Sequence, residues 1–337
     1  MNRINNSQFV ALMLIGDVFM LFCLSGSVTA MTATGFGLGS LLQLIICLPV
    51  LGSLKNGTTL RDSGKIIQTS ALVLAILRGG LLFSLLWSTS GTVYIPYEGD
   101  GVSGKLLVAG LIAAVCVYIS SSGIKALARS ALISAALGGI CLAIVMIFAL
   151  SHTDRETLEI TERQGILSQL LRGFGAGGGL SSLVLMLGCT ENSVSRRRTG
   201  AVYFFARSIL SAVVILTAVL ICGGIMEITE FPVAAAAQLS QPFPVQRIDA
   251  LFLIAFSVFA VYAVCVEAVT ADNLLKQLVP KMKKYRCTAA LAAMCGVGFF
   301  FGGLLRQSWI TAVLAAALPV IWSVWRIFRR REVNSSK

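Results

Sequence analysis

The chain has 337 residues, of which 56% are hydrophobic and only 12% are charged, and its formal net charge is +12. This composition excludes an ordinary soluble protein and indicates an integral membrane protein surrounded by the lipid bilayer. The positive charge is not that of a nucleic-acid-binding protein, because the Lys and Arg residues lie between apolar runs rather than on one polar face. We therefore expect no nucleic-acid partner.

Residues that commonly hold metals, form disulfides or perform catalysis are sparse. The nine cysteines occur without a Cys-x-x-Cys pair, and the single histidine, His152, falls in a polar stretch. The sequence contains no clustered carboxylate pair, no GxxxxGK[ST] phosphate loop and no HExxH motif. We expect neither an enzyme nor a bound metal or cofactor.

Ten apolar segments of the sequence are long enough to cross a bilayer, for which a helix needs about 20 residues. They lie near residues 8–30, 33–54, 66–93, 105–122, 126–150, 166–189, 201–224, 249–274, 287–304 and 309–326. The sequence thus predicts an all-α polytopic membrane protein with a single transmembrane domain and a basic cytoplasmic tail at 327–337. Residues up to Ala30 imitate a signal peptide, but Asp17 within them favours an uncleaved first helix.

The distribution of Lys and Arg predicts the orientation of the chain. With a cytoplasmic N-terminus, the inside segments hold 19 of the 27 Lys and Arg residues and the outside segments hold 6. The other two, Arg78 and Arg207, lie within apolar segments, and Arg207 is close enough to the cytoplasmic side to reach the headgroups. Because cytoplasmic loops are enriched in Lys and Arg, we expect both termini in the cytoplasm.

Topology predicts an inverted repeat. The acidic loop 151–164 divides the chain into two groups of five spans, 8–150 and 166–326. The first span of group one contains Gly16 and a Ser25-Gly26-Ser27 interruption, and the first span of group two contains five glycines within 173–179. Paired interruptions at corresponding positions of two halves are typical of transporters, so helices 1 and 6 are predicted to be broken.

The glycine run is the first candidate for a ligand site. Glycine weakens a helix by about 1 kcal/mol relative to alanine, and an unwound segment offers its amides to a carboxylate beside a half-helix N-terminus. The alternative is a close-packing face of small residues. The candidate ligand-binding residues of this site are Gly16, which would face the run, and Gly173, Gly175, Gly177, Gly178 and Ser181.

Charged residues inside apolar segments form the second set of candidates, since burying a charge in a bilayer is costly. Asp17 and Arg78 are predicted at similar depth, so we expect them to form an ion pair that either locks two helices or borders a ligand path. Glu267 is expected in an inner gate or in an interfacial pairing. Asp272 is expected to pair with Lys276, four residues later on the same helix face.

The long segment between residues 227 and 249 predicts a short helix at Pro232–Leu239, which we expect at the membrane surface. Its role is either that of a passive connector or that of a lid over the outer vestibule. Arg247 and Asp249, at the outer mouth of the following span, are expected either to fix this loop or to act as ordinary interfacial anchors.

Two motifs resemble a known family. The stretch Pro244-Val245-Gln246-Arg247-Ile248-Asp249-Ala250-Leu251-Phe252, and the opening Ser7-Gln8-Phe9 followed by Gly16, are similar to the B subunit of GerA-type endospore germinant receptors, the spore germination permease family. The resemblance implies the amino acid, polyamine and organocation transporter fold, with a five-plus-five inverted repeat. It also implies a subunit that binds a small nutrient germinant such as an amino acid and works with A and C subunits in the spore inner membrane.

Three functions remain open from the sequence. A receptor subunit would pass ligand binding on to partner chains, whereas a self-sufficient secondary transporter would cycle between outward-open and inward-open states. A structural membrane scaffold would need no ligand site.

Overall fold

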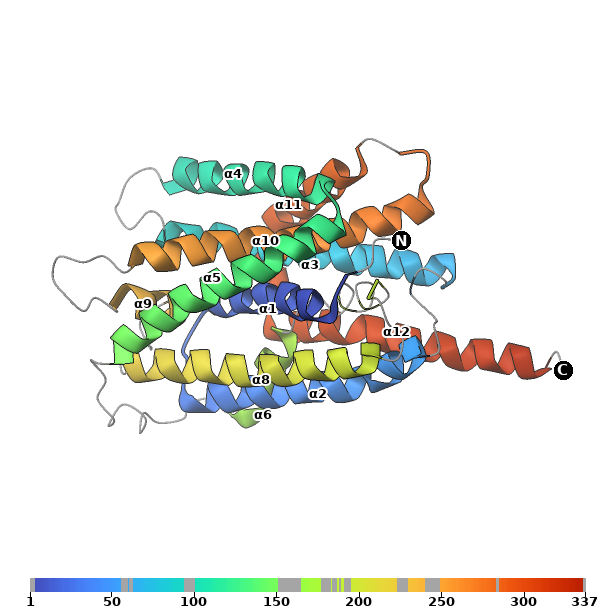
Figure 1. Cartoon of the computed structure of the whole chain (residues 1–337), viewed down its shortest axis with the longest axis horizontal. Coiled ribbons are helices and arrows are strands. Elements are labelled where there is room, and N and C mark those ends of the chain that lie inside the picture. Colours follow the sequence, from blue (N-terminus) through green and yellow to red (C-terminus); the bar gives the residue numbers. More distant parts are fainter. Residues whose placement is uncertain are drawn as a thin grey trace.

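A computed structural model describes residues 4–55, 60, 63–93, 101–150, 165–176, 183, 187, 189–190, 195–222, 230–239, 249–282 and 285–335. The helices are α1 (Asn6–Phe22), α2 (Ala30–Lys55), α3 (Lys65–Val93), α4 (Gly101–Ser121), α5 (Ile124–Leu150), α6 (Ile166–Gly175), α8 (Ser195–Cys222), α9 (Pro232–Leu239), α10 (Asp249–Leu278), α11 (Arg286–Leu305) and α12 (Ser308–Ser335) (Figure 1). The described part of the chain is thus an all-helical bundle.

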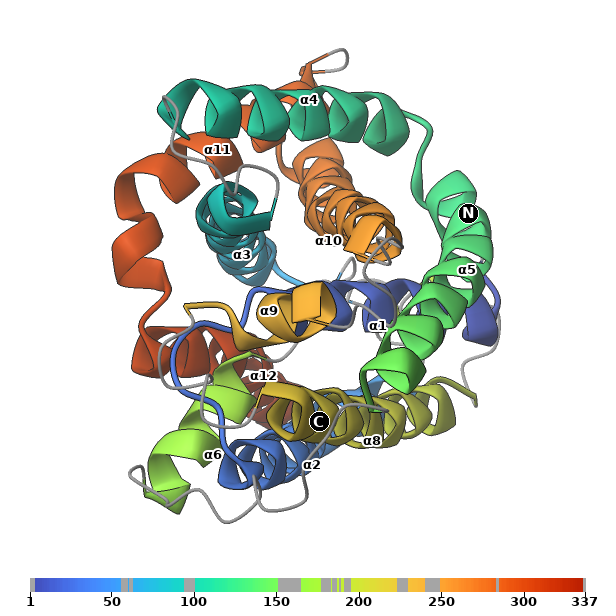
Figure 2. The ribbon, with the colours of Figure 1, turned by 90° about the vertical axis from the view of Figure 1, so that its left-hand side faces the viewer.

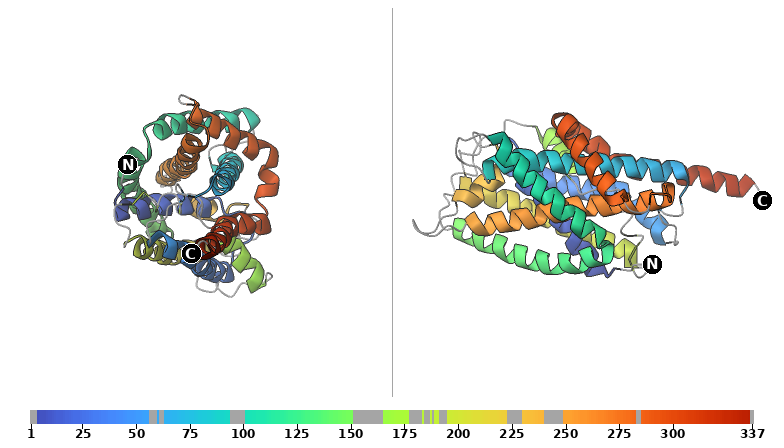
Figure 3. Two further views of the ribbon diagram at one scale, coloured as in Figure 1. Left: turned by 90° about the vertical axis from the view of Figure 1, so that its right-hand side faces the viewer. Right: turned by 90° about the horizontal axis from the view of Figure 1, so that it is seen from above.

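Seven of the described helices are long and apolar enough to cross a membrane, namely α2, α3, α5, α8, α10, α11 and α12. Helices α1 and α4 contain shorter apolar stretches, Asn6–Phe22 and Leu106–Ser121. The chain is therefore an integral, multi-pass membrane protein. The candidate span in α12 ends at Arg326, and the helix continues through most of the predicted tail 327–337 to Ser335 and projects beyond the bundle (Figure 3).

The bundle has an inner and an outer set of helices. Helices α3 and α10 are the most deeply buried of the seven, and Figure 2 shows them enclosed by α4, α5 and α11 on one side and by α1 on the other. Small residues allow this close packing. A Cβ atom on Gly298 of α11 would lie 2.6 Å from the carbonyl oxygen of Gly80 in α3, and one on Gly302 would lie 2.2 Å from Ser84 Oγ. Gly298 and Gly302 form a GxxxG pattern, which brings helix backbones together.

Helix α1 begins and ends at identifiable signals. Asn5 caps its first turn in a capping box, in which the backbone N–H of Asn5 donates to Gln8 Oε1 at 3.1 Å. The helix runs without a break through Gly16 and ends at Phe22, so the interruption lies at Ser25-Gly26-Ser27 alone. Gly26 has a φ of +83°, a conformation that glycine adopts without steric cost. The helix observed in place of the predicted span 8–30 therefore ends eight residues earlier, at Phe22.

Helix α6 has 10 residues and ends at Gly175, which is buried in the bundle. It lies against α2, where a Cβ atom on Gly39 would be 2.5 Å from the backbone nitrogen of Phe174. A Cβ atom on Gly173 would be 2.5 Å from the carbonyl oxygen of Gly35. Gly173 thus lies at a close-packed helix contact. A Cβ atom on Gly175 would be 2.2 Å from Thr311 Oγ1 of α12, so the same holds there.

Helix α9 begins at Pro232, as predicted, and it is packed into the end of the bundle. Phe231, Val233, Ala234 and Ala236 are buried. The helix contacts α8, α5, α1 and α10, and it lies over the centre of the bundle in the end view of Figure 2. The backbone N–H of Gly26 donates to the carbonyl oxygen of Glu230 at 3.0 Å, which ties the α1–α2 connection to the start of α9.

The expected pair of Asp272 and Lys276 is present, with 2.5 Å between Lys276 Nζ and Asp272 Oδ2. Arg286 Nε lies 3.3 Å from the other carboxylate oxygen. The side chain of Lys276 is 49% exposed and that of Arg286 only 13%. Because water screens an exposed charge, the Lys276 pair contributes less to the stability of the protein than the Arg286 pair does. We expect Lys276→Gln to cost below about 1 kcal/mol and Asp272→Asn to cost more, measured by thermal unfolding in detergent. Equal costs would contradict this ranking.

Candidate functional site

Asp17 lies in α1 and is buried. Its Oδ2 atom accepts a hydrogen bond from the Tyr203 hydroxyl of α8 at 2.6 Å and lies 3.6 Å from Arg207 Nε, one helical turn further along α8. The ion-pair partner of Asp17 is thus Arg207, and the expected pairing with Arg78 is wrong as the principal one. Asp17 and Arg78 were paired because the sequence predicts them at similar depth in the membrane. Depth alone does not determine which helices face each other.

Arg207 connects Asp17 to the C-terminal end of α6. Its Nη1 donates to Gln43 Oε1 of α2, and its Nη2 donates to the carbonyl oxygen of Gly173 at 3.4 Å. Gln43 Nε2 donates to the neighbouring carbonyl oxygen of Phe174. The last carbonyls of a helix lack intrahelical partners and carry partial negative charge, so a cation and an amide satisfy them. Arg207 is therefore buried in the bundle, and the expected position at the headgroups is wrong.

Arg78 of α3 lies beside Glu267 of α10. Both side chains are buried and line the same cavity, so the carboxylate of Glu267 lies near the guanidinium of Arg78. Gly16 and Ala263 border the same small cavity of about 20 Å³, room for about one water molecule. A Cβ atom on Gly16 would lie 3.9 Å from the Cα atom of Ala263, and the expected position of Gly16 opposite the glycine run concerns residues 177–179, which lie outside the described part of the chain. Glu267 therefore lies in the core, and the interfacial alternative is wrong.

A polar pocket of about 320 Å³ lies between the C-terminal end of α1 and one side of α6. We use "polar pocket" for the cavity lined by Met20, Cys23, Leu24, Ser25, Gly26, Ser27, Leu81, Leu85, Ser168, Arg172, Ala176, Arg306, Ser308 and Thr311. It contains two arginines and no carboxylate among its lining residues. Such a lining favours an anionic ligand.

The two arginines of the polar pocket are held in place by neighbours. Arg172 of α6 donates from Nη1 to the carbonyl oxygen of Ser27 at 2.9 Å and from Nη2 to that of Ser25. Arg306, at the end of α11, donates to Ser88 Oγ of α3 at 2.6 Å. A guanidinium has five N–H donors, so each arginine has further donors for a ligand. The pocket thus joins the α1–α2 connection, α3, α6 and the α11–α12 junction.

The buried charged residues Asp17 and Arg78 lie about one helical turn from the polar pocket. Asp17 precedes the pocket residue Met20 by three positions on α1, and Arg78 precedes Leu81 by three positions on α3. Residues three apart share a helix face and lie about 5 Å apart along the axis. We call Asp17, Arg78, Tyr203, Arg207 and Glu267 the charge cluster. A ligand in the pocket would lie about one helical turn from it.

Sequence reasoning missed Tyr203, Gln43, Arg172 and Arg306. Arg172 and Arg306 are two of the six Lys and Arg residues that the sequence analysis assigns to outside segments, with no further role. A sequence signal was available for Tyr203, because Tyr203 and Arg207 are four residues apart and therefore share one face of an apolar helix. Of the predicted site residues, Gly177, Gly178, Ser181 and Arg247 lie outside the described residues, and Asp249 is described only as the first residue of α10.

No protein-family model and no curated protein sequence matches this chain. Its structure is similar to a solved structure described as the substrate-bound outward-open state of a Na⁺-coupled sialic acid symporter. The TM-score is 0.54 at 10% sequence identity, and the match covers 99% of this chain and 76% of the symporter chain. At this identity the likeness concerns the fold. The chain is an integral membrane protein that shares the fold of this symporter.

Proposed function

We propose that the chain binds a small carboxylate-bearing nutrient, with an amino acid as the first candidate, in the polar pocket. We further propose that binding is signalled to A and C subunits in the spore inner membrane, as the resemblance to germinant receptors implies. The observation that carries the binding proposal is the pair of arginines, Arg172 and Arg306, in a pocket beside the ends of α1 and α6. Arginines bind carboxylates through strong charge-assisted hydrogen bonds.

The contacts of the site provide a route from ligand to helix movement. A carboxylate held by Arg172 and Arg306 would draw α6 toward the α11–α12 junction. Because Arg207 contacts both the α6 carbonyl of Gly173 and the carboxylate of Asp17, a shift of α6 is passed to α1 and α8. A ligand that fits one of two helix arrangements better than the other shifts the equilibrium between them.

The architecture belongs to the same proposal. We propose that the ten apolar segments form two inverted repeats of five, with broken helices 1 and 6 and with both termini in the cytoplasm. The break at Gly26 and the end of α6 at Gly175 support it.

A self-sufficient secondary transporter is the second candidate function. The similarity in fold to a Na⁺-coupled symporter favours it. The two candidates share the binding site and differ in whether the ligand crosses the membrane. Uptake of the bound amino acid by proteoliposomes that contain only this chain would support the transporter, whereas binding without uptake would support the receptor subunit.

The binding proposal is tested with purified protein in nanodiscs and the set of natural amino acids as probes. We expect Arg306→Gln and Arg172→Gln each to weaken the affinity at least tenfold, since a hydrogen bond to a charged group contributes about 1.5–3 kcal/mol and tenfold corresponds to about 1.4. Arg197→Gln, at an exposed position of α8 outside the pocket, is the control and should bind as the wild type does. Wild-type affinity in both pocket variants would exclude this site.

A further inference from the structure

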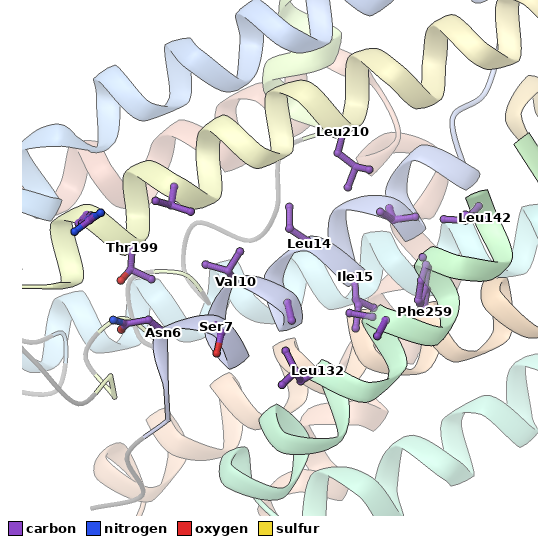
Figure 4. A pocket seen from close by; sticks show the side chains of 17 residues that line it. Asn6, Ser7, Val10, Leu14, Ile15, Leu132, Leu142, Thr199, Leu210 and Phe259 are labelled. Atoms are coloured by element: carbon purple, nitrogen blue, oxygen red, sulfur yellow. The ribbon is translucent and has the colours of Figure 1, made fainter. Parts of the chain in front are cut away.

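A second, larger cavity lies on the side of the bundle, between α1, α5 and α8, as Figure 4 shows from close by. It has a volume of about 850 Å³. We call it the lateral groove. Its wall is made of aliphatic side chains such as Val10 and Leu14 of α1, Leu132 and Leu142 of α5 and Leu210 of α8, with Phe259 of α10 beside them. It is separate from the polar pocket, with which it shares no lining residue.

Polar side chains are confined to one end of the lateral groove. These are Asn6 and Ser7, at the start of α1, and Arg198 and Thr199, near the start of α8. In Figure 4 the labelled oxygen- and nitrogen-bearing side chains of Asn6, Ser7 and Thr199 lie at one side, and Leu142, Leu210 and Phe259 lie at the other. Asp and Glu are absent from the described lining of the groove. The groove therefore has a cationic end and an apolar body.

The length of the groove follows from the helices that line it. It extends from Asn6 to Val18 on α1 and from Arg198 to Leu210 on α8, which is about 18 Å at 1.5 Å per residue. A transmembrane helix of that length, with a diameter of about 10 Å, would occupy about 1,400 Å³ and would not fit fully. A flexible acyl chain with an anionic headgroup matches the volume, the length and the placement of charge.

We propose that the lateral groove is a binding site for an anionic phospholipid, with its phosphate at Arg198 and an acyl chain along α1, α5 and α8. Arg197 and Arg198 are both exposed, but only Arg198 borders the groove. Electrostatic attraction of anionic lipid to basic residues and burial of an acyl chain supply the binding energy. Ile15 and Val18, also in the groove, flank Asp17, so the lipid lies against the helix that carries the charge cluster.

The test is native mass spectrometry of the purified chain after exchange into mixed micelles with phosphatidylglycerol or phosphatidylcholine. We expect the wild type to retain phosphatidylglycerol in preference to phosphatidylcholine and Arg198→Gln to reduce retention at least fivefold. Arg197→Gln is the matched control, with the same charge change one residue away, and should retain the lipid as the wild type does. Equal loss in both variants would overturn the proposal in favour of unspecific attraction to the basic surface.

A second variant tests the apolar body of the groove. Gly139 of α5 lines it, and a Cβ atom there would meet nothing within 4 Å, so Gly139→Leu adds a side chain at an open position of the groove. We expect it to lower lipid retention at least fivefold, whereas Gly296→Leu on α11, also at an open position, should not. Unchanged retention in Gly139→Leu would overturn the acyl-chain site.

Displacement of the lipid by millimolar inorganic phosphate would show a simple anion site and overturn the lipid proposal. A stable dimer, or a bound partner helix in place of lipid, would also overturn the lipid proposal.

Discussion

Arg207→Gln is expected to remove most of the folded protein from the membrane. The substitution leaves the Asp17 carboxylate buried, with the Tyr203 hydroxyl as its hydrogen-bond donor, and it also leaves the carbonyl oxygen of Gly173 without its cation. Breaking a buried ion pair by removing one partner costs about 3–5 kcal/mol. The yield of monodisperse protein in size-exclusion chromatography, together with its thermal unfolding, measures this loss.

Removing both charges should restore part of the stability, because no uncompensated carboxylate then remains. We expect the double variant Asp17→Asn with Arg207→Gln to exceed Arg207→Gln alone in folded yield. Asp17→Asn combined with Arg78→Gln should restore less, because the ion-pair partner of Asp17 is Arg207 and not Arg78. Arg197→Gln, exposed on the same helix, is the control. Additive damage in the first double variant would contradict the assigned pair.

Gly39→Ala is expected to be severely destabilising, and Gly37→Ala, two residues away on α2, is its matched control. The added Cβ atom at Gly39 would lie 2.5 Å from the backbone nitrogen of Phe174, whereas at Gly37 it would lie 3.5 Å from Ser208 Oγ, an ordinary contact. Overpacking costs about 1–3 kcal/mol and more where the obstacle is backbone. Alanine is also a better helix former than glycine by about 1 kcal/mol, so Gly37→Ala should be neutral or slightly stabilising.

Thermal unfolding of the two alanine variants measures this difference, and ligand affinity provides a second measurement. Because Gly39 contacts the end of α6 and α6 carries Arg172, Gly39→Ala should also lower the affinity of the polar pocket in the protein that remains folded. Equal stability of the two variants would show that α2 and α6 are not in close contact.

The positions of the helices along the chain could be predicted, whereas their rotation about their own axes could not. A segment such as Lys65–Val93 is apolar long enough to be recognised from hydropathy alone, and the lone Gly26 between polar serines predicts a local break. A helix that is apolar on all sides has no polar stripe to show which face it buries. For this reason Asp17 was assigned by depth to Arg78, although Arg207 is its ion-pair partner.

The polar pocket was beyond sequence reasoning for a related reason. Its residues come from the α1–α2 connection, α3, α6 and the start of α12, segments that are far apart in the chain. Arg172 and Arg306 have no local pattern that separates them from interfacial anchors. Their role depends on the carbonyl oxygens of Ser25 and Ser27 and on Ser88 Oγ, and these contacts exist only in the folded bundle. The charge cluster was partly accessible, since Asp17 and Arg78 are conspicuous inside apolar segments.

The projecting end of α12 makes this helix a lever. Its first turn carries Ser308 and Thr311 of the polar pocket, and its 28 residues correspond to a rod of about 42 Å. Pro319 lies inside the helix, and a proline there removes one backbone hydrogen bond and provides a natural bending point. The arm from Pro319 to Ser335 is about 24 Å long, so a bend of about 10° displaces its tip by about 4 Å. If the proposed ligand shifts the first turn of α12 by a fraction of an ångström, this geometry would enlarge the shift at the far end, within reach of the proposed partner subunits.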